Sequence, residues 1–207
     1  MSIKLIAFDL DGVLVEDPGS WASVHKGLGT EAESLKHQKE FFEGRIDYDE
    51  WAKKDARLWD DVDVRAIEDI LYQVPLMEGI EETLPILKKK YKLVILSGGL
   101  KILADRVGHR FNMDYIAANE LLLENNKVKG IRQSVSFNDK GRLLRHVAMS
   151  FNIKASECAA VGDFLNDAPM FDASGLSVAF NPKSQELVKK ANYTVYQKDL
   201  KKLLDIF

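Results

Sequence analysis

The chain has 207 residues, of which 46% are hydrophobic and 29% charged, and its formal net charge is −3. This length allows one large domain or a domain that carries a smaller one. No apolar run approaches the roughly 20 residues of a membrane-spanning helix, and no signal-peptide pattern opens the chain. We therefore expect a cytoplasmic protein. The single cysteine, Cys158, cannot form an internal disulfide.

The charge is unevenly distributed. Residues 16–75 hold 15 acidic and 8 basic side chains, whereas the remainder carries a small positive excess. An acidic segment over a mildly basic remainder is a poor surface for nucleic acid. We expect no nucleic acid and no membrane as partner, but a small anionic ligand in a cleft of a monomer or homodimer.

Short apolar runs alternate with helical patterns along most of the chain. The runs that predict strands are 3–9, 92–99, 158–163 and 175–180, and the helical patterns are 80–91, 100–111, 140–151 and 166–174. Continuous apolar strands between helices are typical of a parallel sheet that is covered on both faces. The sequence thus predicts an α/β fold with a doubly wound parallel sheet.

The first predicted strand ends in two acids. Asp9 and Asp11 interrupt the apolar stretch "IAFDLDGVLV" of residues 6–15. An isolated buried carboxylate is costly, so such acids are usually paired with a cation or reactive. Strand alternation sends both side chains the same way, and a bend at Gly12 lets the second lean over the first.

Residues 16–75 break the alternation, because they contain no convincing strand. Their aromatic residues lie at helical spacing and are Trp21, Phe41, Phe42, Tyr48, Trp51 and Trp59. We predict three or four helices inserted between the first strand and its return near Pro75. The aromatics should form the core of a small helical bundle, with one or two lining a substrate pocket. The predicted domains are 1–15 with 76–207, and 16–75.

The second predicted strand ends in Ser97, Gly98 and Gly99, directly before a helix. A hydroxyl, unshielded N–H groups and a helix N-terminus together favour a phosphate site, although a plain strand-to-helix turn has the same pattern. Residues 121–133 then predict a β-hairpin that turns at Asn125-Asn126.

Lys140 opens the next helical pattern and shares one stripe with Leu144, Val147 and Phe151. The apolar members of this stripe should face the sheet, which would direct the lysine toward the strand ends. A solvated surface lysine is the alternative interpretation.

The third predicted strand ends in Gly162-Asp163, and Asn166 and Asp167 follow shortly after. Asp167 on its own could cap the following helix. Because parallel strands end at one edge of the sheet, four carboxylates would meet there, and that density requires a cation. Hard oxygen ligands without nearby histidine or cysteine favour Mg²⁺, which often bridges a carboxylate and a phosphate.

These groups together suggest phosphoryl transfer. A carboxylate beside Mg²⁺ and a phosphate site can attack phosphorus and form an aspartyl-phosphate. The cation and Lys140 would neutralise the phosphoryl oxygens, and a second carboxylate could protonate the leaving group and then activate water.

Four motifs resemble the haloacid dehalogenase superfamily of phosphohydrolases, and within it the phosphoserine phosphatase group. They are "DLDGVL" (9–14), "LSGGL" (96–100), "NDKG" (138–141) and "GDFLNDAPM" (162–170), in the order and spacing of that family over nearly the whole chain. The resemblance implies that residues 16–75 form a helical cap that closes over the site.

The resemblance also implies residue roles. Asp9 would be the nucleophile and Asp11 the acid/base, with Asp167 acting from behind the metal ligands. The substrate contacts would come from Ser97, Gly98, Lys140 and Asn166. The Mg²⁺ ligands would be Asp9, the Asp11 backbone carbonyl and Asp163.

The sequence departs from that group in the cap. Phosphoserine phosphatases carry a cap glutamate and a cap arginine that hold the amino and carboxylate groups of serine. Pro18 and Asp55 align with these two places, and Glu16, Asp17 and Arg57 lie nearby in the sequence.

We predict a Mg²⁺-dependent phosphatase that hydrolyses a small, phosphoserine-like phosphomonoester through an aspartyl-phosphate. A phosphotransferase that uses the same intermediate would carry the same motifs. A non-catalytic phospho-receiver domain also groups acids, a hydroxyl and a lysine around Mg²⁺. Asp11, placed to activate water, and the long insertion argue against a receiver.

Overall fold

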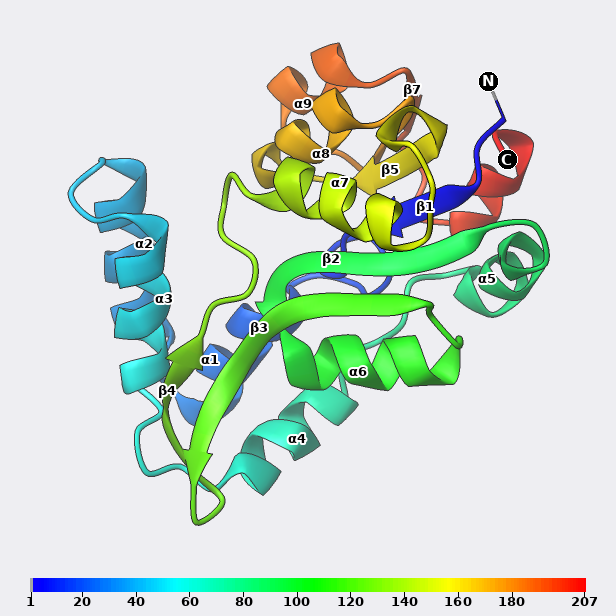
Figure 1. The fold of residues 1–207 in the computed structure, drawn as a ribbon. Helices are drawn as coiled ribbons and strands as arrows, with labels where there is room; N and C mark the ends of the chain where they lie inside the picture. Colours follow the sequence, from blue (N-terminus) through cyan, green and yellow to red (C-terminus); the bar gives the residue numbers. More distant parts are fainter. Residues whose placement is uncertain (1) are drawn as a thin grey trace.

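One seven-stranded sheet organises the computed structural model, which describes residues 2–207 (Figure 1). Its strand order is β4-β3-β2-β1-β5-β6-β7, and all neighbours pair in parallel except β3 and β4. The strands are β1 (Leu5–Phe8), β2 (Lys92–Leu100), β3 (Tyr115–Glu124), β4 (Lys127–Arg132), β5 (Cys158–Gly162), β6 (Leu176–Phe180) and β7 (Tyr193–Val195). The predicted doubly wound parallel sheet is confirmed; β7, with three residues, is too short to give a sequence pattern.

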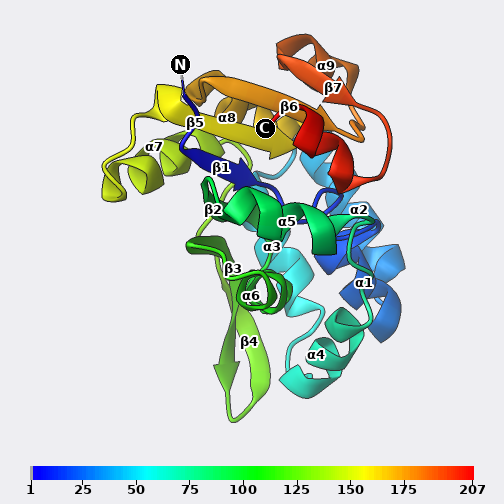
Figure 2. The ribbon, with the colours of Figure 1, turned by 90° about the vertical axis from the view of Figure 1, so that its right-hand side faces the viewer.

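Helices cover both faces of the sheet. They are α1 (Gly19–Leu28), α2 (Glu31–Phe42), α3 (Tyr48–Arg57), α4 (Val64–Tyr72), α5 (Ile80–Lys88), α6 (Lys101–Arg110), α7 (Lys140–Ser150), α8 (Ala168–Ala173) and α9 (Gln185–Lys190), with short 3-10 helices at η1 (Ala155–Glu157), η2 (Leu165–Asp167) and η3 (Leu200–Asp205). Figures 1 and 2 show α7, α8 and α9 on one face and α5 and α6 on the other. Within residues 2–207, no helix has the length and apolar character needed to cross a membrane.

The alternation of side chains along β1 divides the core into two. Leu5 and Ala7 pack in one apolar cluster with Leu144 and Val147 of α7. Ile6 and Phe8 belong to a second and larger cluster on the opposite face. Since successive side chains of a strand point to opposite faces, a fully apolar strand is what a sheet covered on both sides needs.

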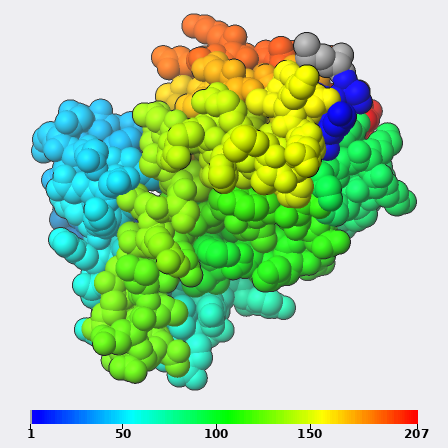
Figure 3. All heavy atoms as spheres, in the orientation of Figure 1, coloured from blue at the N-terminus to red at the C-terminus, as the bar shows by residue number. Residues whose placement is uncertain are grey.

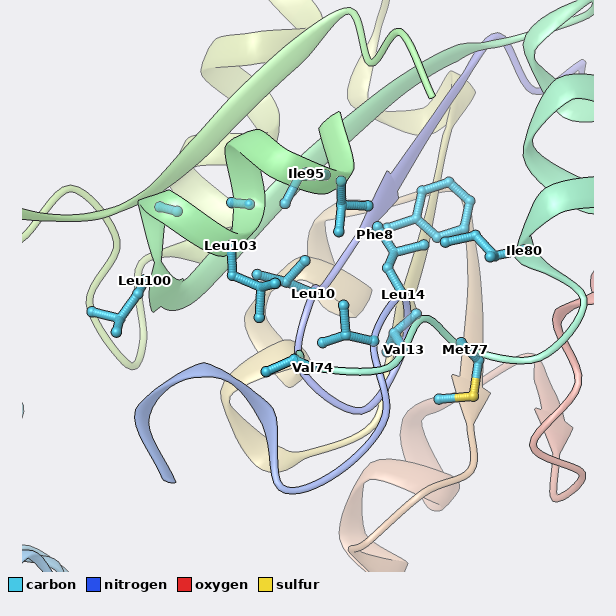
Figure 4. Packing of buried hydrophobic residues seen from close by; sticks show 14 of the residues in the cluster. Phe8, Leu10, Val13, Leu14, Val74, Met77, Ile80, Ile95, Leu100 and Leu103 are labelled. Carbon is cyan, nitrogen blue, oxygen red and sulfur yellow. The ribbon is translucent and has the colours of Figure 1, made fainter. Parts of the chain in front are cut away.

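The larger cluster also fixes the turn that follows β1. Figure 4 shows Leu10, Val13 and Leu14 directed into the same apolar core as Phe8. Gly12 between them has φ +81°, and a Cβ there would collide with the Asp163 carboxylate. The glycine therefore lets the chain turn back directly beside the end of β5.

Four helices, α1 to α4, fill the insertion, as the sequence predicts. Residues of α2 and α3 form a lobe at one side of the molecule in the space-filling view (Figure 3). The aromatic core predicted there is confirmed for Trp59, which is fully buried. Four of the other aromatics line the cavities described below. The domain boundaries at 15/16 and 75/76 stay a prediction.

The predicted hairpin is confirmed and starts earlier than expected. β3 begins beside β2 in parallel and continues outward as an antiparallel ribbon with β4. Asn125 and Asn126 make the turn with φ values of 51° and 62°, which suit asparagine. The ribbon packs against α3, so it braces the helical insertion from the sheet side.

We expect Leu144→Ala to lower the free energy of unfolding by about 2–5 kcal/mol, because it empties a fully buried position between α7 and the sheet. Leu123→Ala is the matched control, since Leu123 is 48% exposed on β3. It should change stability by less than about 0.5 kcal/mol. Urea unfolding measures both; equal losses would contradict the packing described here.

Candidate active site

Three neighbouring strands bring the predicted site residues together at their carboxyl ends. Asp9 follows β1, Ser97 lies near the end of β2, and Asp163 follows β5. All three residues are at most 4% exposed. This is the edge at which open parallel sheets bind ligands.

Lys140 reaches the same point from the N-terminus of α7. Its Nζ lies 2.9 Å from Asp9 Oδ2 and 2.6 Å from Asp167 Oδ1, and the side chain is fully buried. Burial opposes its charge, but the two carboxylates outweigh burial and raise its pKa. The alternative of a solvated surface lysine is therefore wrong.

Asp167 has its oxygens fully engaged. Oδ1 accepts from Lys140, and Oδ2 accepts from the backbone N–H groups of Asp163 (2.9 Å) and Phe164 (3.2 Å). It makes no side-chain capping bond to α8, so the capping interpretation is wrong. Its contacts hold the loop after β5 in place.

Asp9, Asp163 and Asp167 form a buried group whose carboxylate oxygens lie within 4.8 Å of one another. Asp163 Oδ2 has no hydrogen-bond partner in this group. Burial first, and then the neighbouring carboxylates, raise the pKa of Asp163, and burial likewise raises that of Asp167. Three clustered carboxylates fit a hard divalent cation. The Asp11 backbone carbonyl stays a predicted ligand.

Lys183 was missed by the sequence analysis. It follows β6, and its Nζ lies 2.7 Å from Asp163 Oδ2 and contacts Asp17 as well. It therefore links the chain before α1 to the carboxylate after β5. A lysine just beyond a strand end was the signal that could have identified it.

Ser20, at the start of α1, holds Asp11 from both sides. Its N–H donates to Asp11 Oδ1 (2.9 Å) and its hydroxyl donates to Oδ2 (2.7 Å). The Leu100 N–H donates in turn to Ser20 Oγ (3.0 Å). Burial raises the pKa of Asp11 to about 6, and the Ser20 bonds limit that rise. No pattern in the sequence indicated a role for Ser20.

The Gly98 carbonyl is held by residues from two directions. It accepts from Trp21 Nε1 and from Asn119 Nδ2, both at 3.0 Å. Gly99 N–H donates to Ser97 Oγ at 3.0 Å. Asn119, fully buried on β3, was also missed; its Oδ1 accepts from two backbone N–H groups at 134 and 135. These bonds fix the loop that is predicted to bind phosphate.

Two adjoining cavities extend from this edge. The strand-end cavity, of about 460 Å³, is lined by Asp9, Ser97, Gly98, Asp163 and Asn166 among others. The helix-lined cavity, of about 290 Å³, lies among α1, α2 and α3. Both share several lining residues: Asp11, Pro18, Trp21, Gln38, Tyr48 and Trp51.

The aromatic residues of the insertion pack on one another, as predicted, and four of them also line the cavities. The ring centroids of Trp21 and Trp59 lie 5.2 Å apart, and those of Tyr48 and Trp51 lie 5.9 Å apart. Trp21, Tyr48 and Trp51 line both cavities, and Phe42 lines the strand-end cavity. None of these four residues is fully buried, and no residue of α2 is buried. More aromatics than the expected one or two therefore face the cavities.

The two cap positions singled out in the sequence both reach the helix-lined cavity. Pro18 and Asp55 line it, whereas Glu16, Asp17 and Arg57 do not. Asp55 is buried, with His37 Nδ1 2.6 Å from Oδ1 and His25 Nε2 3.3 Å from Oδ2. Ser34 Oγ also donates to Oδ2 at 3.1 Å.

Comparison with known proteins agrees with this arrangement. The family model of haloacid dehalogenase-like hydrolases matches residues 3–175. A phosphoserine phosphatase of Methanocaldococcus jannaschii is 31% identical over 204 residues, covering 97% of this chain and 96% of that protein. One from Wolinella succinogenes is 31% identical over 98% of both chains.

Two solved structures superpose on essentially the whole chain. A substrate-bound phosphoserine phosphatase complex superposes with a TM-score of 0.89 at 30% identity, over 100% of this chain and 99% of that one. A phospho-aspartyl intermediate analogue of phosphoserine phosphatase gives a TM-score of 0.88 at 30% identity over the whole of both chains.

Without a cation, the carboxylates at the strand ends should make stability depend on pH. Their pKa values are raised on folding, so the folded state keeps protons that the unfolded state has lost. The protonated carboxylates contribute to the free energy of unfolding in full below about pH 4. This contribution is lost as the pH rises through their raised pKa values, which for Asp11 is about 6.

We expect MgCl₂ to raise Tm more at pH 8 than at pH 5, because ionised carboxylates bind the cation and it offsets their repulsion. At 100 times Kd the gain is about 2.7 kcal/mol, roughly 5–10 °C for a chain of this size. Asp163→Asn should remove most of the gain, and the exposed Asp60→Asn should leave it. A gain independent of pH would contradict the assignment.

Proposed function

Because the chain belongs to the haloacid dehalogenase-like hydrolases, we propose that it is a Mg²⁺-dependent phosphatase that hydrolyses a small phosphomonoester through an aspartyl-phosphate on Asp9. One observation supports this most directly. A buried carboxylate, Asp9, lies beside the Lys140 ammonium and close to two further buried acids, Asp163 and Asp167. The resemblance to a phospho-aspartyl intermediate analogue supports the same chemistry.

Asp9 is suited to nucleophilic attack by its hydrogen bonding. Oδ1 accepts from the Leu10 N–H at 2.7 Å, and Oδ2 lies beside Lys140. These contacts hold the carboxylate in one orientation at the base of the strand-end cavity. A fixed nucleophile gains from proximity, since less motion is lost on reaching the transition state.

Other residues of the site would bind the substrate and the cation. Ser97, Gly98 and Asn166 line the strand-end cavity and would contact the phosphoryl oxygens or the bound substrate, together with Lys140. Asn166 Oδ1 is buried without a partner, which suits a group that awaits a ligand. Asp9, Asp163 and the Asp11 carbonyl would hold Mg²⁺, which when bound supplies positive charge to the phosphoryl oxygens.

Asp11 would protonate the leaving oxygen and then activate water. With a pKa of about 6 it keeps a usable fraction of the protonated form near neutral pH. It lines both cavities, so its carboxyl group lies between the phosphate end and the rest of the substrate. The helices of residues 16–75 would act as a cap, since Trp21 donates from α1 directly to the Gly98 carbonyl.

Asp9→Asn should eliminate turnover while leaving the fold intact, as judged by circular dichroism, because an amide cannot attack phosphorus. Wild-type protein mixed with ³²P-labelled substrate and Mg²⁺, then quenched in acid, should carry an acyl-phosphate on Asp9. Asp60→Asn, on the exposed surface, is the control and should turn over normally. Label on a serine or histidine, or a long-lived phosphorylated form without turnover, would contradict the proposal.

Ser20→Ala should lower kcat/KM for alkyl phosphates by about tenfold or more, the value of a hydrogen bond to a charged group. Aryl phosphates, whose leaving groups need little protonation, should lose less than threefold. Ser150→Ala removes a hydroxyl that bonds only to a helix carbonyl and is the control. The same loss for both substrate classes would mean that Ser20 does not act through Asp11.

A further inference from the structure

The helix-lined cavity is within reach of the part of the substrate beyond the phosphate. Asp11 lines both cavities, and Asp9 lines the strand-end cavity, where the phosphate would bind. A leaving oxygen beside Asp11 can therefore extend its carbon chain toward α1, α2 and α3. The volume of this cavity is about 290 Å³.

We propose, on the basis of the phosphatase function above, that the preferred substrate is the phosphate monoester of a small, uncharged polyhydroxylated molecule, such as a polyol or a sugar. The proposal depends on three features of the helix-lined cavity. These are its charge, its hydrogen-bond donor without a partner, and its aromatic walls.

The charge of the cavity disfavours a substrate carboxylate. Among residues 2–207, no lysine or arginine lines it, whereas the acids Asp11, Glu31 and Asp55 do. Asp55 is buried, and its neighbouring hydrogen-bonding groups come from Ser34, His25 and His37. A carboxylate placed here would be desolvated among acids without a permanent counter-charge, which is costly.

One donor at the cavity lacks a hydrogen-bond partner. Trp51 Nε1 is buried and unpaired, and Trp51 lines the cavity. The indole N–H can only donate. His25 Nε2 lies 3.3 Å from Asp55 Oδ2, so an N–H at this atom faces that carboxylate. The cavity thus offers one donor, the Trp51 N–H, that needs an acceptor.

A hydroxyl group meets these requirements, and the alternatives do not. It can accept from an N–H donor and donate to a carboxylate, whereas an ammonium only donates and an alkyl group does neither. Trp21, Tyr48 and Trp51 also provide ring surfaces on which the C–H groups of a polyol can pack. An ammonium would gain from the acids and rings but would leave the Trp51 N–H unpaired.

Four esters of three-carbon primary alcohols test this with wild-type protein and Mg²⁺: glycerol 3-phosphate, O-phosphoserine, 3-aminopropyl phosphate and propyl phosphate. Relative to the propyl ester, one hydrogen bond from the Trp51 N–H and one to a cavity carboxylate, at about 1 kcal/mol each, predict a preference of roughly 30-fold. Relative to the aminopropyl ester, the bond from the Trp51 N–H alone predicts about fivefold. We expect glycerol 3-phosphate to exceed each of the others at least fivefold in kcat/KM. A smaller ratio, or preference for phosphoserine or the aminopropyl ester, overturns the inference.

Trp51→Phe keeps a ring and removes the indole N–H. It should raise KM for glycerol 3-phosphate about three- to tenfold and change propyl phosphate less than twofold, while Tyr72→Phe, on the exposed surface, changes neither. Equal effects on both esters would exclude the N–H contact. If the variant does not fold, as judged by its thermal melt, the wild-type ranking still decides.

p-Nitrophenyl phosphate separates this inference from the proposed function. Hydrolysis of the aryl ester with the wrong ranking of alkyl esters overturns only the substrate class. If no ester is hydrolysed in the presence of Mg²⁺, the phosphatase proposal is overturned, and the inference about the substrate class is overturned as well.

Discussion

The ion pairs of Lys140 with Asp9 and Asp167 are the interaction on which the rest of the site depends. Three parallel strands end together, and their loops bury several carboxylates within a few ångströms of one another. Such a group would repel itself without a cation in the protein. Lys140, fully buried at the start of α7, supplies that charge, and removing one partner of a buried pair typically costs about 3–5 kcal/mol. The same ammonium fixes the orientation of the carboxylate that we propose as nucleophile.

The sequence predicts the strand-end residues well because the rule behind them is local. A polar residue directly after an apolar strand must lie at the carboxyl edge of a parallel sheet, whichever strands are neighbours. Asp9, Ser97 and Asp163 follow from that rule alone, and Lys140 follows from the apolar stripe of its own helix. The strand order, with β1 between β2 and β5, then makes these residues adjacent.

Ser20 and Asn119 could not be predicted because their roles exist only between distant segments. Ser20 contacts Leu100 across 80 positions, and Asn119 reaches back 21 positions to Gly98. Neither contact leaves a periodicity or a spacing in the sequence. The cavity-lining role of the aromatics in the insertion could not be predicted for a related reason. Helical spacing indicates that Trp21 and Trp51 share a pattern with core residues, but not that one side of each ring lines a cavity.

The bonds of Ser20 have a consequence for exchanging parts between relatives. The group that orients Asp11 belongs to the inserted helices, while Asp11 belongs to the sheet. A chimera that takes residues 16–75 from a relative would therefore receive a new substrate cavity and a new partner for Asp11 together. In the mechanism that we propose, substrate choice and proton delivery are inherited as one unit, and a graft that changes the first must restore the second.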